Sequence, residues 1–582
     1  AAKRGDFSGE AVTIRDPLAN SLPFPNNAIP PARVSNAAKQ FLPFWPEPNS
    51  GDPTRIASRN YVAQQPRPFD KPHNAQTRLD YRISDANTLF GRYLHNRFRN
   101  NWFESGLPGT LGMRDQLRVV KHMLISDTHV FSPTLINEFR FGIPYDTNPR
   151  WAKQVDGPAF LRAAGLINVT RDGKIPNVPQ LPVISFARGP GIQTIAATRQ
   201  RLFNHNITFQ WQNTLSKIAG KHSLRLGFEV NKRHFNDQYQ PNNLFGNYQF
   251  TDQYTGFNFA DFLLGIPTRI NREPFAERQE RRSVGYDFFV QDNYKITNSL
   301  TLNLGVRYEL HPGWTEAGGA RLSAFDKKTG SIVVPDKALP LVSDVFPTHL
   351  VPVIGNSKTD FNDRMLRTDK NNFAPRIGFA WRPFGAKTLV IRSAYGIFYE
   401  ITASWITIYG PPFAVSEPSY TNPKDVKDPG FVQWPLAFPR IVRGAGVSLP
   451  STYEHGFSLP YAQNWNFTVE KDVAGMSVRA SYVGTGGRQM ATSFNINQPA
   501  PGPGLYVDKP RAFPALADIR ELRNGASHTY HALNLEVERR FARGLMYQSS
   551  FTFAKDLGDE AVTPENTFDR GRERAQTQMT PF

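Results

Sequence analysis

The residues whose types could support chemistry lie toward the end of the chain. His528 and His531 are three residues apart, a spacing that on a helix would place both imidazoles on one face, where they could bind a metal ion. On a β-strand the same spacing places them on opposite faces, so they cannot readily share an ion. Glu536 and Glu538 do share a strand face, as paired general acid–base carboxylates do. A polar wall facing water needs such residues too, and this second interpretation is favoured.

Two glycine-containing segments resemble nucleotide-binding loops in composition but not in spacing. The GAKT segment at 385–388 lacks both the earlier glycine and a glycine directly before the lysine, so it predicts a hairpin turn. The GTGG segment at 484–487 follows a strand pattern, but no helical pattern comes after it, which argues against a dinucleotide site. We therefore expect no catalytic, metal-binding or cofactor-binding residues and no cofactor, and we expect that the protein is not an enzyme.

Composition narrows the class of protein. The 582 residues include 68 Lys plus Arg against 50 Asp plus Glu, a formal net charge of +18, and no Cys, which excludes disulfides and Cys-ligated metals. The basic residues are scattered, whereas a nucleic-acid site gathers them beside aromatics, so we expect no nucleic-acid partner. Solvated loops explain the excess best, and contact with a polyanion such as lipopolysaccharide phosphate is the alternative. Abundant Pro, Gly, Phe and Tyr favour an all-β protein with long loops.

The elements that would position these residues are alternating strands. No stretch of the sequence approaches the about 20 consecutive apolar residues of a membrane helix, but a barrel strand needs only about 9–11 alternating residues. Residues 300–310 have this character, and 206–212 and 223–231 repeat it. We expect lipid contact for Leu302, Leu304, Val306, Leu224, Leu226 and Phe228, and a lumen position for Asn303, Arg307, Arg225 and Glu229.

The strands come in pairs around short turns. Seven hairpins, or fourteen strands, are predicted at 77–83 with 88–95, 116–130 with 134–143, 206–215 with 223–232, 284–295 with 300–310, 372–382 with 388–399, 464–470 with 476–482, and 531–540 with 545–553. The connections between hairpins run from roughly twenty to sixty residues, far above the usual about 4–6. Two of them are expected to hold a short helix, at 32–42 and 157–166.

Short turns at one end and long loops at the other are typical of an outer-membrane barrel. A soluble sandwich or propeller would have more even spacing. Aromatics expected on or near the apolar faces, as in interfacial girdles, are Tyr308, Trp381, Tyr395, Tyr399, Trp465, Tyr482 and Tyr547. Pro375 fits a paired strand poorly, so we expect it near the loop end of its strand, where pairing has stopped.

The expected fold is therefore all-β, a transmembrane antiparallel outer-membrane β-barrel, partial and of about fourteen strands. Residues 1–76 are expected to be an extracellular-loop region, 77–554 the barrel strands with their loops, and 555–582 a loop cut short after the last strand. The connections 146–204 and 402–460 are expected to be extracellular, and the turns at 217–221 and 297–299 periplasmic.

Several segments, in order, resemble one family. The residues 5–9, 14–18 and 24–35 are similar to a loop of Oar-like TonB-dependent receptors of the acidobacterial type. Further matches are 259–265, 291–295 leading into 302–309, 372–381 and 530–533. The resemblance covers nearly the whole chain.

The resemblance implies an outer-membrane barrel of about twenty-two strands around a plug, importing large ligands with energy from the TonB complex. We recognise no plug, TonB box, carboxypeptidase-regulatory-like domain or signal peptide, so a fragment is expected. Its strands should form either a strongly curved sheet with a gap or a strained smaller barrel, with an empty lumen. Expected partners are outer-membrane lipid and lipopolysaccharide, the TonB complex for the full-length protein, and an unknown extracellular ligand. The alternatives are a structural or adhesive surface protein and, least favoured, a secreted enzyme.

Overall fold

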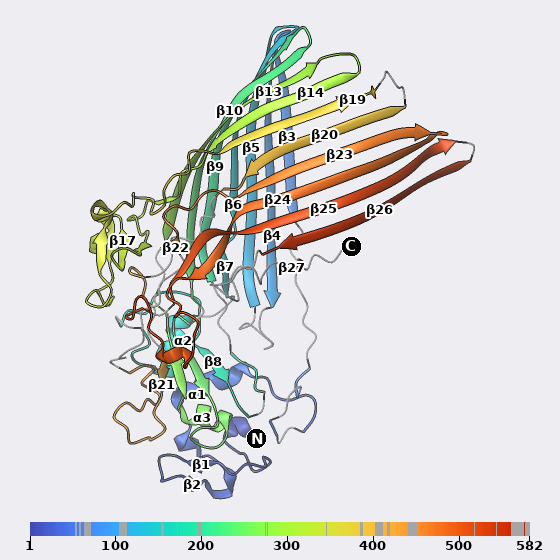
Figure 1. Ribbon diagram of the computed structural model, residues 1–582. Helices are drawn as coiled ribbons and strands as arrows, with labels where there is room; N and C mark the ends of the chain where they lie inside the picture. Colours follow the sequence, from blue (N-terminus) through green and yellow to red (C-terminus); the bar gives the residue numbers. More distant parts are fainter. Residues whose placement is uncertain are drawn as a thin grey trace.

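The computed structural model describes residues 1–559 and 575–576, with gaps at 53–54, 57–59, 63–71, 104–112, 153–155, 171–172, 190, 196–199, 242, 274, 276–277, 345, 384–387, 402–410, 416–418, 440–451, 517 and 543. Its main feature is one large antiparallel sheet that runs diagonally across Figure 1. Among the described residues, no helix has the length and apolar character that crossing a membrane requires.

Fourteen long strands form this sheet, and each pairs antiparallel with the next in chain order. They are β3 (His73–Ser84), β4 (Asn87–Phe103), β5 (Met113–Ser132), β6 (Leu135–Thr147), β9 (Gln200–Ala219), β10 (His222–Gln240), β13 (Gln279–Lys295), β14 (Leu300–Leu310), β19 (Phe373–Trp381), β20 (Leu389–Tyr399), β23 (Tyr461–Val473), β24 (Met476–Asn495), β25 (Arg520–Ala542) and β26 (Leu545–Gly558). All seven predicted hairpins are confirmed. Several strands continue beyond the alternating part, so that only 104–112 separates β4 from β5, less than expected.

Short strands extend the sheet at its margins. They are β7 (Arg150–Ala152), which lies against both β5 and β9, β15 (Thr315–Glu316) on β13, β22 (Thr452–Tyr453) on β25, and β27 (Ala575–Gln576) on β26. The strands belong to one barrel sheet. Within the described ranges, however, β3 pairs only with β4, and β26 only with β25 and β27, so no ladder joins the two ends of the series. Every residue of β3 is exposed, as expected of an edge.

The register divides the sheet into two chemically distinct faces, because residues opposite each other on paired strands share a face. Leu226 pairs with Val290, which pairs with Val306, and all three are exposed and apolar. Arg225 pairs with Gln291 on the other side. We call these the apolar face and the polar face. The predicted separation of the lipid and lumen sets onto two faces is confirmed, and all seven predicted aromatics lie on the apolar face.

Pro375 lies at a point where one of its two ladders has ended. The ladder from β19 to β20 begins at Arg376, so on that side pairing has stopped, as expected. On the other side the ladder to β14 continues past Pro375 to Phe373, which the sequence did not predict. A proline is tolerated where its missing N–H faces no partner.

The long connections fold together at one end of the sheet, opposite the hairpin turns (Figure 1). They form α2 (Gly157–Ala164), α3 (Asn258–Leu264) and a sheet of β8 (Val183–Phe186), β11 (Asn247–Phe250), β12 (Arg269–Asn271) and β21 (Tyr420–Thr421), and α1 (Asn36–Phe41) from the segment before β3 packs with them. We call this unit the loop cap. Smaller elements are the pair β1 (Arg15–Asp16) and β2 (Leu22–Pro23), and a sheet of β16 (Ala324–Asp326), β17 (Ser331–Val334) and β18 (Val353–Gly355). The two predicted helices are confirmed as α1 and α2, and α3 was not predicted.

An aromatic core holds the loop cap together. The ring of Phe262 on α3 lies 5.4 Å from that of Phe250 and 5.9 Å from that of Trp434, measured between centroids. Asp261 beside it accepts hydrogen bonds from the Thr255 amide at 2.8 Å and hydroxyl at 2.6 Å. Burial raises the pKa of Asp261 to about 7. The connections are therefore a packed unit rather than separate loops.

The same arginine substitution should have opposite effects on the two faces of the sheet. Leu304→Arg on the apolar face would place a guanidinium in lipid, at a cost of about 2–4 kcal/mol near the bilayer midplane. Asn303→Arg would place it on the polar face. We expect Leu304→Arg to reduce assembly into the outer membrane strongly and Asn303→Arg to be tolerated, as measured by the protein recovered in outer-membrane fractions. Equal recovery of the two variants would contradict the assignment of faces.

Candidate functional site

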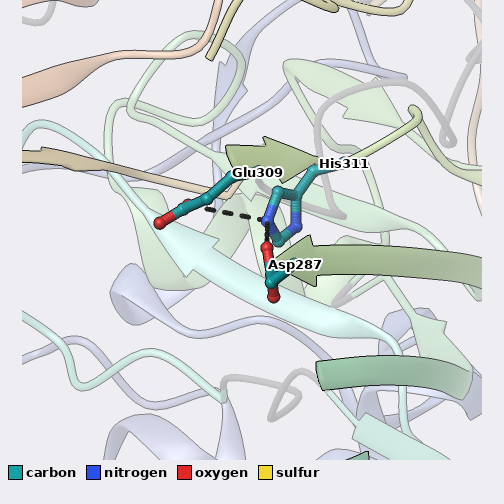
Figure 2. Close-up of side chains that lie close together, drawn as sticks. All are labelled: Asp287, Glu309 and His311. Carbon is teal, nitrogen blue, oxygen red and sulfur yellow. Dashed lines mark hydrogen bonds and ion pairs between the residues drawn. The ribbon is translucent and has the colours of Figure 1, made fainter. Parts of the chain in front are cut away.

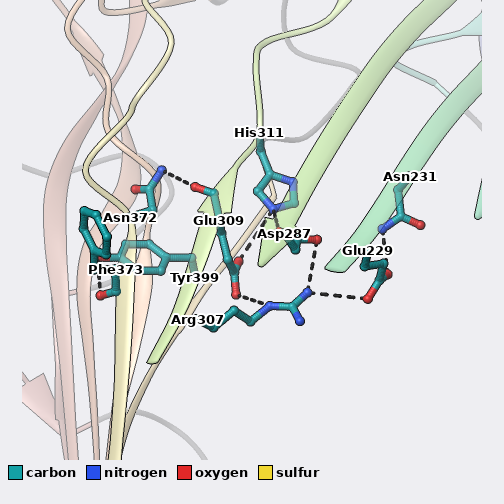
Figure 3. A network of polar contacts seen from close by, with 9 residues as sticks. All are labelled: Glu229, Asn231, Asp287, Arg307, Glu309, His311, Asn372, Phe373 and Tyr399. Carbon is teal, nitrogen blue, oxygen red and sulfur yellow. Dashed lines mark hydrogen bonds and ion pairs between the residues drawn. The ribbon is translucent and has the colours of Figure 1, made fainter. Parts of the chain in front are cut away.

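Three carboxylates lie side by side on the polar face, where β13 runs between β10 and β14. Asp287 on β13 is opposite Glu229 on β10 and opposite Glu309 on β14. Each occupies a polar-face position of its own strand, and the register of the two ladders places the three opposite one another. Like charges directly opposite each other are destabilising, so this row requires cations. Figure 3 shows how the neighbouring side chains supply them.

Arg307, two residues before Glu309 on β14, reaches all three carboxylates. Its Nη2 lies 3.1 Å from Asp287 Oδ2 and 3.5 Å from Glu229 Oε2, and its Nε lies 3.1 Å from Glu309 Oε1. Hydrogen bonds between ionised groups are stronger than neutral ones. The guanidinium therefore joins three strands across the polar face.

His311 completes the group just after the last residue of β14. Its Nε2 lies 2.9 Å from Asp287 Oδ1 and 3.6 Å from Glu309 Oε2, the two carboxylate oxygens that Arg307 leaves open (Figure 2). Burial opposes protonation of this imidazole, but hydrogen bonds with the two carboxylates outweigh it, so the pKa of His311 lies above its ordinary value. We call Glu229, Asp287, Arg307, Glu309 and His311 the polar cluster.

The polar cluster contains the donor set of a metal site but has its own counter-charges. Ligand atoms of Asp287, Glu309 and His311 lie within 4.8 Å of one another, and one imidazole with two carboxylates is a set that transition metals use. The three carboxylates carry three negative charges, and two positive charges lie near them. These are Arg307 and Arg233, and Arg233 interacts electrostatically with Asp287 and Glu229. A proton on His311 brings the total to neutrality, whereas a divalent ion with neutral His311 would leave a positive excess. The arrangement is suited to holding a proton and fixing three strands.

Sequence reasoning placed Arg307 and Glu229 in the lumen but did not identify the polar cluster. Asp287 belongs to the predicted strand 284–295, and Glu309 with His311 forms an acid-x-His pair at the end of the alternating run. That pair is the feature of the sequence that could have indicated the polar cluster. The contact of Asp287 with Glu309 and His311 could not be predicted, because the sequence of one strand does not determine its register with the next.

The residues that the sequence singled out occupy separate places on β25. His528 Nε2 lies 2.5 Å from Asp556 Oδ1, and His531 Nδ1 lies 2.7 Å from the Tyr482 hydroxyl on the apolar face. The prediction that a strand separates the two imidazoles is confirmed. Glu536 accepts a 2.9 Å hydrogen bond from Arg479 and is thus part of an ion pair on the polar face. Glu538 lies on the same face.

The structure tests the prediction for one of the two glycine segments but not for the other. Residues 384–387 lie outside the described part of the chain, so the predicted turn at 385–388 stays a prediction. The segment 484–487 lies inside β24 rather than after a strand, which corrects its placement. Gly484 is opposite Trp465, and a Cβ there would lie 2.2 Å from the indole ring. The glycine is needed for this contact with the ring.

The chain matches the family model described as the outer membrane beta barrel domain over residues 1–580. It belongs to this family. The match and the two-faced antiparallel sheet place this barrel protein in the outer membrane and its fold in the all-β class. No curated protein matches the chain.

Solved structures similar to the chain include outer-membrane transporters and receptors. The outer membrane transporter YddB from Escherichia coli has 11% identity and a TM-score of 0.46, over 85% of this chain and 50% of that one. The alcaligin outer-membrane receptor FauA from Bordetella pertussis has 9% identity and a TM-score of 0.41, over 83% and 53%. The FrpB iron transporter from Neisseria meningitidis has 10% identity and a TM-score of 0.40, over 83% and 51%. The chain spans about half the length of these proteins.

The role of Arg307 in the barrel can be measured. Arg307→Gln leaves three carboxylates facing one another, and breaking a buried ion pair costs about 3–5 kcal/mol, which we lower to about 2 kcal/mol because the Arg307 side chain is 22% exposed. We expect a clearly lower urea midpoint for loss of the folded, heat-modifiable form in outer-membrane fractions.

A second substitution separates charge repulsion from lost packing. Adding Asp287→Asn to Arg307→Gln removes one of the three facing charges and should restore part of the lost stability. Arg78→Gln, which removes an exposed arginine paired with Asp80, serves as the control and should change the midpoint little. An Arg307→Gln midpoint equal to that of the control would refute the structural role of the polar cluster.

Proposed function

We propose that the chain forms the barrel of an outer-membrane receptor and transporter that takes up a large ligand with energy from the TonB complex. The observation that carries the proposal is the polar face, which continues through all fourteen long strands while the opposite face is apolar. In a membrane such a sheet encloses an aqueous lumen. The protein then acts by conformational gating rather than by bond chemistry.

The loop cap supports a receptor role. Its small sheet joins strands from three different connections: β8 follows β6, β11 and β12 follow β10, and β21 follows β20. Loops held together in this way present a fixed surface, which reduces the ordering cost of binding a ligand. An adhesive protein could use the same surface without transport, and this is the second candidate function. Outer-membrane lipid and lipopolysaccharide are the proposed surroundings in both cases.

A nutrient panel distinguishes the two functions. A deletion strain and its complemented parent would be compared for uptake of labelled oligosaccharides and labelled iron chelates, each with and without a working TonB complex. Transport predicts loss of uptake of one class in the deletion strain and the same loss without TonB. Normal uptake of the whole panel together with lost surface attachment would contradict transport and favour adhesion.

The proposed topology places the loop cap outside the cell and the hairpin turns in the periplasm, because short turns are periplasmic in such barrels. The chain has no cysteine, so single cysteines report position cleanly. We expect Lys424→Cys, an exposed position in the 402–460 connection, to react with an impermeant thiol reagent on intact cells, and Asn298→Cys to react only after the outer membrane is opened. The reverse pattern would overturn the topology.

A further inference from the structure

A cavity of about 780 Å³ opens on the polar face across β9, β10, β13, β14, β19, β20 and β23. Four arginines line it, Arg225, Arg307, Arg376 and Arg392, and no aspartate or glutamate is among its described lining residues. The rest of the polar lining is amide-rich, including Gln291 and Asn303. We call this cavity the arginine pocket. Its chemistry differs from that of the neighbouring polar cluster, where acids outnumber bases.

The floor of the arginine pocket contains three glycines, with the Phe398 ring beside Gly396 and the Ala394 side chain beside Gly378. Gly305, Gly378 and Gly396 come from three adjacent strands, β14, β19 and β20. A Cβ at Gly378 would lie 3.0 Å from the carbonyl oxygen of Ser393, so even a methyl group is disfavoured there. Glycine in a strand interior often marks a bulge, a tight bend or a place where a ligand or another backbone approaches closely.

The four arginines fall into two classes. Arg307 is held by the three carboxylates of the polar cluster, and Arg392 Nη1 lies 2.8 Å from Glu470 Oε2. Arg225 and Arg376 have no carboxylate within ion-pair distance in the described part of the chain. Arg376 instead lies over the ring of Phe398, 4.8 Å from its centroid. Two exposed positive charges therefore lack a counter-charge among the residues that the structure describes.

The register fixes how far apart these two arginines are. Arg225 pairs with Gln291, Gln291 with Gly305, and Gly305 with Arg376, so they are three strand spacings apart, about 14 Å between Cα atoms. Between them lie an amide and the glycine floor. This spacing suits a molecule with two separated acidic groups better than a single small anion.

We propose that the arginine pocket binds an extended, hydroxyl-rich polyanion, the chemistry of an acidic oligosaccharide. One acidic group binds at Arg225 and another at Arg376, because guanidinium groups bind carboxylate and phosphate through paired hydrogen bonds. Amides such as Gln291 and Asn303 bind hydroxyl groups between them. The inference deepens the proposed uptake function by naming its ligand class, but binding itself requires neither TonB nor transport.

Calorimetric titration of the purified protein in detergent tests the pocket at low ionic strength. The probes are trigalacturonate, which carries carboxylates, inositol hexakisphosphate, which carries phosphates, and neutral maltotriose. We expect saturable binding of the trigalacturonate and none of maltotriose. In Arg225→Gln/Arg376→Gln the affinity should fall about tenfold or more for each lost charge-assisted contact. Binding of the phosphate probe alone would overturn the oligosaccharide assignment.

A charge-matched control excludes a general electrostatic effect. Arg78→Gln/Arg140→Gln removes two arginines that also lie on the polar face but outside the pocket, and should leave affinity almost unchanged. Equal losses in the two double variants, or unchanged affinity in the pocket variant with normal heat-modifiable mobility, would refute the proposal. Normal uptake in the deletion strain, together with arginine-dependent binding by the purified protein, would instead count against transport alone.

Discussion

Backbone pairing is the constraint on which the rest of the molecule depends. In hydrocarbon an unpaired N–H or C=O group costs several kcal/mol, so a chain that crosses the bilayer in strands must pair them in ladders. Long ladders fix the register, and the register fixes which side chains share a face. The apolar row of Leu226, Val290 and Val306 and the polar row opposite it are consequences of the same pairing. A one-residue slip would reverse both.

The same pairing explains where charge gathers. Because β13 aligns Asp287 with both Glu229 and Glu309, the ladder forces three carboxylates together, and Arg307 with His311 relieves the repulsion. These charges stabilise the sheet in the register that creates them. Packing follows a similar rule where Gly484 gives room to the Trp465 ring across a ladder.

The parts of the fold that could be predicted are those with a local signal. Period-two alternation and short turns sufficed for seven hairpins, because both are properties of neighbouring residues. Strand ends were missed where β24 and β25 continue without alternation, since there no lipid dictates the pattern. The loop cap was missed for a different reason. Phe250, Phe262 and Trp434 meet from distant connections, and nothing in any one connection shows that it has a partner.

The contrast between the polar cluster and the arginine pocket separates structural charge from available charge. A charge that serves the fold has its counter-charge in the fold, as Arg307 has in three acids and Arg392 in Glu470. Arg225 and Arg376 share the same face but have no such carboxylate partners among the described residues, and they border a floor that contains three glycines. Exposed cations without a carboxylate partner repel one another and form no ion pair that links neighbouring strands. A negative group that comes from outside the described chain would supply the counter-charge for these two positions, which lie within one cavity.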